Sequence, residues 1–321
     1  PPRSTLFPYT TLFRSGVLVT GLGCENNRLS ELKASLGTYD PLRIRFMECQ
    51  AVEDEMQTGL GLIGELVEEA SSDKRVPVPI SELIIGLKCG GSDAFSGITA
   101  NPLLGVLTDR LIGLGASAVM AEVPEMFGAE KFLMERSLDR KVFADMVGMI
   151  DFYNDHFLSH GVTLYENPSP GNKEGGITTL EEKSLGCIRK SGTSPIVDVV
   201  PYGEIVSKKG MNLLYSPGND LVSSTALAAA GAQIILFTTG RGTPYGSPVP
   251  TVKIASNSKL AQTKHGWIDF DAGTLTSDGD YNSAAGSLMD LIRGIASGEI
   301  RTKNEINGHR DIAIFKSGVT L

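Results

Sequence analysis

The feature that most constrains this chain is a unit repeated along it: a short apolar run, a glycine-rich or polar loop, then a helix-like segment. The apolar runs of the clearest copies cover residues 17–20, 83–87, 116–121 and 234–239. Strands that alternate with helices favour a mostly parallel α/β sheet. Ligands bind such sheets at the carboxyl ends of the strands, where these loops would lie. We expect further strands at 196–200, 251–255 and 267–270.

The length of the chain and one glycine- and proline-rich segment predict two α/β domains. The 321 residues correspond to about two domains of ~100–200 residues each. The segment NPSPGNKEGG has no periodicity and is rich in glycine and proline, which indicates a boundary. We therefore expect a central domain over 16–164 and a C-terminal domain over 165–321. Residues 1–15 lack an initiator Met and repeat TLF, so we treat them as a non-native or processing-derived leader.

Composition excludes several classes of protein. Hydrophobic residues make up 41% and charged residues 21% of the chain, which is typical of a globular protein. The net charge of −8 disfavours nucleic-acid binding. Gly231 interrupts the uncharged stretch 221–240. We therefore expect a buried helix followed by a strand there, and no membrane span. Cys24, Cys49, Cys89 and Cys187 lie far apart without a CxxC pair, which favours a reducing cytoplasm.

Two of the glycine-rich loops carry a cysteine. In GLGCENN, Cys24 and Glu25 stand at a strand-to-helix turn, where helix N–H groups lower a thiol pKa. An ordinary turn is the alternative, and the missing third glycine does not support a dinucleotide site. In KCGGSDAFSG, Cys89, Ser92 and Asp93 offer donors and acceptors to a polyol or carboxylate. Here the alternative is a tight turn with a small buried cysteine.

Other loops offer carboxylates and cations. Glu122, with Glu125 and Glu130 close behind it in AEVPEMFGAE, could bind a metal or act in acid–base catalysis, or could simply complement a helix dipole. Arg241, between two glycines in GRGTPYG, is suited to bidentate carboxylate binding. Lys173 in NPSPGNKEGG is a second cation.

The segment KHGWIDFDAG combines His265 with Asp269 and Asp271. Alternation along a strand would place both carboxylates on one face. A histidine with carboxylates suits Fe²⁺ or Mn²⁺, whereas the plain alternative is a strand with one solvated face. Neither a GxSxG elbow, nor HExxH, nor an EF-hand loop occurs in the sequence.

Together these motifs resemble the altronate/galactarate dehydratase family. The resemblance extends from residue 16 to residue 321 in family order, and ENPSPGN and EVPEMFGAE look like the altronate branch. It is carried by GLGCENN, KCGGSDAFSGITANPLLG, EVPEMFGAE, ENPSPGNKEGGITTLEEKSLG, GRGTPYG, KHGWIDFDAG and IAIFKSGVTL.

The resemblance implies a cytoplasmic, Fe²⁺- or Mn²⁺-dependent hydro-lyase of hexuronate catabolism. Its substrate would be D-altronate, which loses water to give 2-dehydro-3-deoxy-D-gluconate. It also implies that the chain begins downstream of an N-terminal region carried by full-length members. We expect a small-molecule partner and a homo-oligomer, with no nucleic acid or membrane.

Removal of the C2 proton and loss of the C3 hydroxyl require a base, an acid and a cation on the carboxylate. The sequence supplies candidates for each role, without distances. They are, for catalysis, His265, Lys173 and Cys89; for substrate binding, Ser92, Asp93, Asn172, Asn219, Arg241 and Tyr245; and for the metal, Cys24, Glu25, Glu122 and Asp269.

Three alternatives stay open on the sequence. The substrate could be galactarate or a sulfolactate-like acid that undergoes a related elimination. Three of the cysteines could hold an iron–sulfur cluster instead. Outside enzymes, the chain could be a non-catalytic module that binds sugar acids.

Overall fold

The computed structural model describes residues 16–162 and 167–315 of the chain, so the leader expected over residues 1–15 lies outside the described residues. The chain divides into two compact units. One comprises the chain up to Val78 together with Gly203–Ile205, and the other comprises Pro79–Tyr202 and the chain from Val206 onward.

The first unit is a parallel strand pair with two helices. Strand β1 (Val17–Gly21) pairs with β2 (Ile44–Glu48) in the register Val17↔Ile44 to Gly21↔Glu48. Helix α2 (Leu29–Leu36) connects the strands, and α3 (Glu55–Ser71) follows β2. Asp54 begins α3 by accepting a hydrogen bond from the backbone N–H of Gln57, as an N-cap residue does.

The second unit is built on a seven-stranded, entirely parallel sheet in the order β5-β6-β4-β3-β7-β8-β9. This sheet confirms the α/β class and the mostly parallel pairing predicted from the repeated unit. In chain order its strands are β3 (Ile84–Cys89), β4 (Ser117–Met120), β5 (Ile196–Val200), β6 (Gly210–Leu214), β7 (Ile234–Thr239), β8 (Thr251–Ala255) and β9 (Phe270–Asp271).

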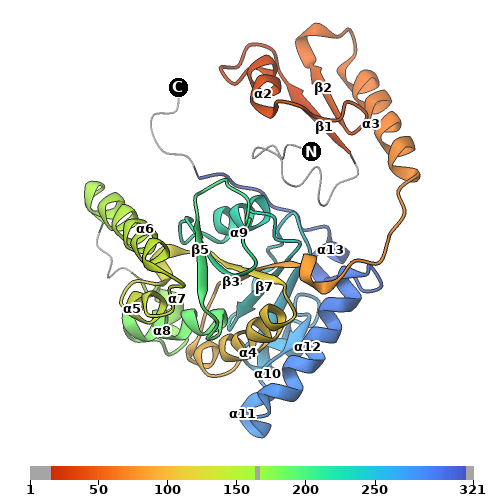
Figure 1. The fold of residues 1–321 in the computed structure, drawn as a ribbon. Helices are drawn as coiled ribbons and strands as arrows, with labels where there is room; N and C mark the ends of the chain where they lie inside the picture. The colour runs from red at the N-terminus through yellow and green to blue at the C-terminus, as the bar shows by residue number, and fades with distance from the viewer. Residues whose placement is uncertain (1–15, 163–166, 316–321) are drawn as a thin grey trace. The chain divides into compact units, whose positions relative to one another are not determined.

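Helices surround this sheet (Figure 1). Contacts place α9 against β3 and β7, while α4 packs on β4 and β7 and against α12. In chain order the helices of this unit are α4 (Ala100–Gly113), α5 (Glu130–Met134), α6 (Arg140–Ser159), α7 (Pro170–Glu174), α8 (Leu180–Ile188), α9 (Asp220–Ala229), α10 (Ser258–Thr263), α11 (Leu275–Asp278), α12 (Tyr281–Ala296) and α13 (Lys303–Asn307).

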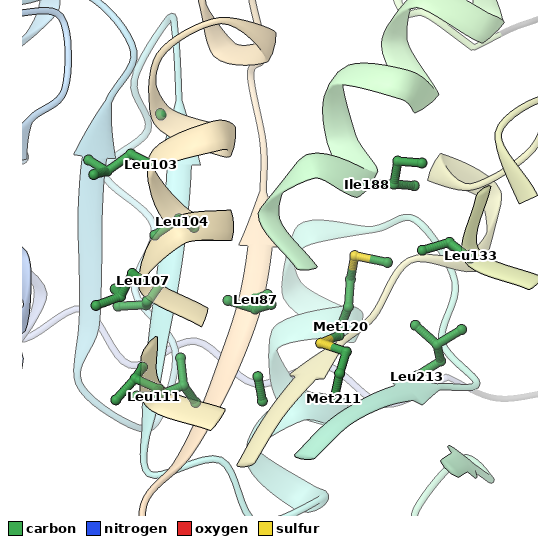
Figure 2. Packing of buried hydrophobic residues seen from close by; sticks show 14 of the residues in the cluster. Leu87, Leu103, Leu104, Leu107, Leu111, Met120, Leu133, Ile188, Met211 and Leu213 are labelled. Carbon is green, nitrogen blue, oxygen red and sulfur yellow. The ribbon is translucent and has the colours of Figure 1, made fainter. Parts of the chain in front are cut away.

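The core of the second unit lies between α4 and the sheet. Leu103, Leu107 and Leu111 recur at helical spacing on one face of α4 and are fully buried. Leu87 of β3 belongs to the same apolar cluster, and Figure 2 shows it among the α4 leucines and Met120 of β4. Each buried leucine contributes about 1.5–3 kcal/mol, so this packing fixes β3 firmly in the sheet.

The predicted strands match the structure with one exception. The runs at 196–200, 234–239 and 251–255 are confirmed as β5, β7 and β8. The strand expected at 267–270 is reduced to Phe270–Asp271, because Trp267 and Ile268 donate backbone hydrogen bonds to Lys264 and form turns. Asp269 therefore precedes the strand, and the expected alternation of Asp269 and Asp271 on one strand face is wrong.

The boundary expected between residues 164 and 165 does not separate two units in the structure. Strand β4, before that position, pairs with β6, after it, and β3 likewise pairs with β7. The division lies instead between Val78 and Pro79. A glycine- and proline-rich segment can thus be an ordered loop inside a domain when its polar groups find partners.

In the part of the chain that the structure describes, no helix combines the length and the apolar character that a membrane crossing needs.

Candidate active site

The strand order places a topological switch point at the carboxyl ends of β3 and β7. These strands are neighbours, but the chain leaves β3 through α4 towards β4, and leaves β7 towards β8 on the opposite side. Loops that leave adjacent strands in opposite directions define a topological switch point, the usual ligand position in open α/β sheets. The loops KCGGSDAFSG and GRGTPYG lie there, as the sequence predicts.

Backbone hydrogen bonds hold these two loops together. The N–H of Gly90 donates to the carbonyl of Thr238, and the N–H groups of Gly240 and Arg241 both donate to the carbonyl of Gly91, all at 3.0 Å. A Cβ at Gly90 would lie 2.6 Å from the Asp220 carboxylate and 2.7 Å from the Phe237 ring, so a larger residue would displace these side chains. The first glycine of the pair in KCGGSDAFSG thus allows close approach to a charged group.

Asp93 joins two loops at the same edge. Its carboxylate accepts hydrogen bonds from the Ser96 backbone N–H and the Ser96 hydroxyl, from the Ser256 hydroxyl at 2.7 Å and from the Asn257 amide at 3.0 Å. The side chain is buried, and these donors occupy both of its oxygens. The structure thus gives Asp93, predicted to bind substrate, an anchoring function between the loops after β3 and β8.

The segment NPSPGNKEGG approaches the same loops through α7. The amide of Asn172 donates to the Ser92 carbonyl at 2.8 Å, and Arg241 Nη1 donates to the Gly171 carbonyl at 2.8 Å and to Glu174 Oε2 at 2.9 Å. Half of the Arg241 side chain remains exposed (46%). Lys173, the other predicted cation, is exposed on the same short helix. Ser92 and Arg241, on two loops, and Asn172 and Lys173, on α7, therefore lie in adjoining segments.

A buried lysine lies directly before the first of these loops. Lys88 is fully buried, and its ammonium donates to Glu122, to Asp220 Oδ1 at 2.6 Å and to the Cys89 carbonyl at 2.7 Å. The Phe237 ring lies 5.5 Å from the ammonium. Although burial alone would lower the pKa of Lys88, the carboxylates of Glu122 and Asp220 raise it above its usual value.

The next residue of the strand, Cys89, lies in a second group of ionisable side chains. Its Sγ is 3.3 Å from Cys187 Sγ and accepts a hydrogen bond from Lys190 Nζ at 3.1 Å. The hydrogen bond with Cys187 and the charge of Lys190 together hold the pKa of the Cys89 thiol well below its usual value. The same contact with Cys89, together with burial, raises the pKa of Cys187.

Glu125 connects this second group to another lysine. Cys187 Sγ donates to Glu125 Oε2 at 3.4 Å, and Lys183 Nζ donates to Glu125 Oε1 at 2.9 Å and to Asn167 at 2.6 Å. Burial would raise the pKa of Glu125, but Lys183 outweighs it and lowers the value. Ammonium groups thus face carboxylates and thiols around one strand end. We call the set the β3 cluster: Lys88, Cys89, Glu122, Glu125, Lys183, Cys187, Lys190 and Asp220.

Glu122 occupies the centre of the β3 cluster in a strained conformation. It is buried and has φ of +68°, in the left-handed region that side chains other than glycine and asparagine rarely adopt. Burial raises its pKa to about 8, against the opposing effect of Lys88. Strained backbone and displaced pKa values are both concentrated at functional sites. The strained backbone and the raised pKa together single out Glu122 as a candidate for proton transfer.

Two other predicted substrate-binding residues lie close to Lys88. Tyr245 is buried against Phe237, with ring centroids 6.0 Å apart, and burial raises its pKa to about 12. Asn219 accepts hydrogen bonds from the N–H groups of Leu221 and Val222 and so begins α9, whose first residue, Asp220, binds Lys88. Asn219 thus orients the carboxylate of the following residue.

The four predicted metal ligands do not form one site. Glu122 follows β4 and Asp269 precedes β9, and four strand spacings of ~4.8 Å separate these strands by roughly 19 Å. In the first unit, Glu25 accepts hydrogen bonds from the N–H groups of Leu22 and Gly23, and the Gln50 amide contacts Cys24. Among the residues described, no group of three or more His, Cys, Asp or Glu side chains is arranged to hold a metal ion.

The predicted site residues around β9 lie in other surroundings: Asp269 is hydrogen-bonded to the backbone, and His265 is exposed. The carboxylate of Asp269 accepts hydrogen bonds from the N–H groups of Lys253 at 2.9 Å and Lys303 at 2.8 Å. His265 is exposed in the turn after α10. In the described chain no contact joins either residue to the β3 cluster.

Sequence reasoning missed five members of the β3 cluster as site residues: Lys88, Lys183, Cys187, Lys190 and Asp220. Two patterns could have revealed them. Lys88 is the one charged residue in the buried strand IIGLKC, and a charge inside a fully buried strand requires a partner. Lys183, Cys187 and Lys190 stand at spacings of four and three, which favours one side of the helical segment formed by α8 and the 3₁₀ turn Arg189–Ser191 that follows it.

Fold and site together define an α/β protein with a buried acid–base cluster at its topological switch point. Comparison with known proteins identifies the family. Residues 80–320 match the family described as D-galactarate/altronate dehydratase, C-terminal, and residues 14–71 match the D-galactarate dehydratase/altronate hydrolase second domain. The chain belongs to the D-galactarate/altronate dehydratase family.

Individual relatives agree with this assignment. The chain is 54% identical to an altronate dehydratase of Bacillus subtilis and 52% identical to one of Escherichia coli. Each alignment covers 95% of the present chain. It is 35% identical to the galactarate dehydratase (L-threo-forming) of Escherichia coli over 94% of its length. It spans 62%, 61% and 60% of these relatives, respectively.

Proposed function

We propose that this protein is a hydro-lyase that converts D-altronate into 2-dehydro-3-deoxy-D-gluconate and water. The observation that carries the proposal is the β3 cluster at the switch point of a chain more than half identical to two altronate dehydratases. A buried set of ammonium, carboxylate and thiol groups supplies both an acid and a base. Exposed cations on adjoining loops supply a site for a carboxylate.

The elimination makes specific demands on the protein. The C2 proton of a sugar acid is weakly acidic because its removal places a second negative charge beside the carboxylate. The exposed guanidinium of Arg241 is suited to bind that carboxylate through two hydrogen bonds. Glu122 is suited to transfer a proton, because its pKa near 8 lies close to the working pH. Catalytic roles for His265 and Lys173 stay predictions.

We also propose that the reaction requires Fe²⁺ or Mn²⁺, as the family resemblance implies. The Glu122 carboxylate pairs with the Lys88 ammonium and is remote from Asp269 along the sheet, so the four predicted ligands do not fit one ion. Chelation followed by addition of each metal tests the requirement. Loss of activity on chelation that either ion restores supports it, and full activity after chelation contradicts it.

The decisive experiment incubates the chain, and the same chain extended to the length of its relatives, with D-altronate, galactarate and sulfolactate. We expect a 2-keto-3-deoxy product from D-altronate at a kcat/KM at least tenfold above that for galactarate. Sulfite release from sulfolactate would instead support the activity of a fourth relative, a (2R)-sulfolactate sulfo-lyase subunit beta that is 34% identical. Thermal stabilisation by altronate without product from either form would indicate a binding module.

We further propose a cytoplasmic homo-oligomer. The four cysteines are free, which suits a reducing compartment. Light scattering of the purified chain tests the oligomeric state, and a monomeric mass would contradict it.

A further inference from the structure

Two buried thiols meet at the edge of the site from segments that are remote in the sequence. Cys89 ends β3, and Cys187 lies in the last turn of α8, yet their Sγ atoms are 3.3 Å apart. Both side chains are almost inaccessible, with 4% and 2% of their surface exposed. A disulfide has an S–S distance of ~2.05 Å, so bond formation requires an approach of only about 1.3 Å.

The two sulfurs have unequal surroundings. Lys190 Nζ lies 3.1 Å from Cys89 Sγ, whereas Cys187 Sγ donates to the carboxylate of Glu125 at 3.4 Å. A neighbouring ammonium stabilises a thiolate, the reactive form of cysteine, and a neighbouring carboxylate can accept the proton of a thiol. Cys89, beside the Lys190 ammonium, is therefore suited to attack an oxidant as a thiolate. Cys187, beside the Glu125 carboxylate, is suited to give up its proton and form the second bond.

We propose that Cys89 and Cys187 are a reversible redox pair that a small peroxide converts into a disulfide. The Cys89 thiolate attacks one oxygen of hydrogen peroxide, the O–O bond breaks, and sulfenic acid and hydroxide result. Cys187 then attacks the Cys89 sulfur, so that the S–S bond forms and the S–O bond breaks. The proton of Cys187 passes through Glu125 to the departing hydroxide, which leaves as water.

The disulfide would act directly on the β3 cluster. It removes the anion that Lys190 faces and leaves a buried ammonium without its partner. It also draws the residue that follows Lys88 towards α8. Oxidation is therefore expected to suppress acid–base chemistry at the site, and reduction is expected to restore it.

The test measures chemistry at the sulfurs, so its outcome does not depend on the proposed dehydration. The protein is exposed to hydrogen peroxide, its remaining thiols are alkylated under denaturing conditions, and its peptides are analysed by mass spectrometry. We expect a crosslink between the peptides containing Cys89 and Cys187, with loss of two hydrogen atoms, that disappears after treatment with dithiothreitol. A crosslink confined to Cys24 and Cys49, or intact thiols at Cys89 and Cys187 after oxidation of Cys24, would overturn the proposal.

Variants separate the two steps of the reaction. Cys187→Ser should abolish the crosslink and let Cys89 proceed to sulfinic acid, because the resolving thiol is gone. Lys190→Gln should slow the loss of the Cys89 thiol about fivefold or more, since the thiolate loses its ammonium. The matched control Cys49→Ser should crosslink like the parent protein. Equal rates in the parent and Lys190→Gln proteins would contradict the assigned role of Lys190.

Discussion

The charged residues at the end of β3 and those before β9 look alike in sequence but differ in structure. Both regions contain a lysine in a buried strand, Lys88 in β3 and Lys253 in β8, followed by glycine-rich or acidic segments. Lys88 is held by Glu122 and Asp220. Lys253 donates to a backbone carbonyl of Thr243 at 2.7 Å, and burial lowers its pKa to about 8.

The difference shows what distinguishes a reactive site from a structural one. At β3, side chains satisfy one another, so protons can be redistributed among them. Near β9, the polar side chains are instead hydrogen-bonded to the backbone. The carboxylate of Asp269, for example, accepts hydrogen bonds from two backbone N–H groups. We therefore assign acid–base chemistry to the β3 cluster and a structural function to Asp269.

The largest expected effect is that of removing the lysine from the β3 cluster. Lys88→Met leaves Glu122 without a counterion, and breaking a buried ion pair costs about 3–5 kcal/mol. We expect a corresponding fall in the free energy of unfolding, measured in urea, and a loss of kcat/KM of about 100-fold or more.

The matched control is Lys264→Met, which removes an exposed lysine near β9 that contacts the Trp267 ring. It should change the free energy of unfolding by less than about 1 kcal/mol. Equal effects of the two substitutions would abolish the distinction between the regions.

The second effect concerns the exposed cation beside the cluster. Arg241→Ala should lower kcat/KM for D-altronate by about 10- to 100-fold, because a hydrogen bond to a charged group contributes ~1.5–3 kcal/mol. Steady-state kinetics measure the change, with Arg293→Ala on α12 as a control, because this arginine also pairs with a carboxylate at the surface. An unchanged kcat/KM would remove Arg241 from the substrate site.

The third effect is on the pH dependence of stability. Burial raises the pKa of Glu122 from 4.5 to about 8, so its stabilising contribution is complete below pH 4.5 and is lost as the pH rises through 8. Between pH 6.5 and pH 8, the parent protein should lose ~1–2 kcal/mol, or about 3–6 °C in Tm, relative to Glu122→Gln. Parallel melting curves for the two proteins across this range would contradict the raised pKa.

The smallest effect is expected at the exposed histidine. His265→Ala should change kcat/KM by less than about threefold, because no described contact joins His265 to the β3 cluster. A loss of tenfold or more would show that the segment before β9 contributes to catalysis, as the sequence predicts, and would extend the site beyond the switch point.

The sequence predicts the fold and the meeting of loops better than it predicts the chemistry. Ser92 and Arg241 could be placed together because each lies near glycines in a loop that follows a strand of a parallel sheet. The contacts of Cys89 with Cys187 and Lys190 could not be predicted from the sequence. They depend on how the region of α8 packs against β3, nearly one hundred residues away along the chain. The backbone donors to Asp269 were equally invisible, because Lys303 lies far along the chain.

Hydrogen–deuterium exchange with and without D-altronate tests most directly whether the substrate binds at the carboxyl ends of β3 and β7. We predict slower exchange on binding in residues 88–97, 122–126, 170–176 and 240–245, with residues 258–271 unaffected. Protection confined to 258–271, or no protection in the loops after β3 and β7, would contradict this account.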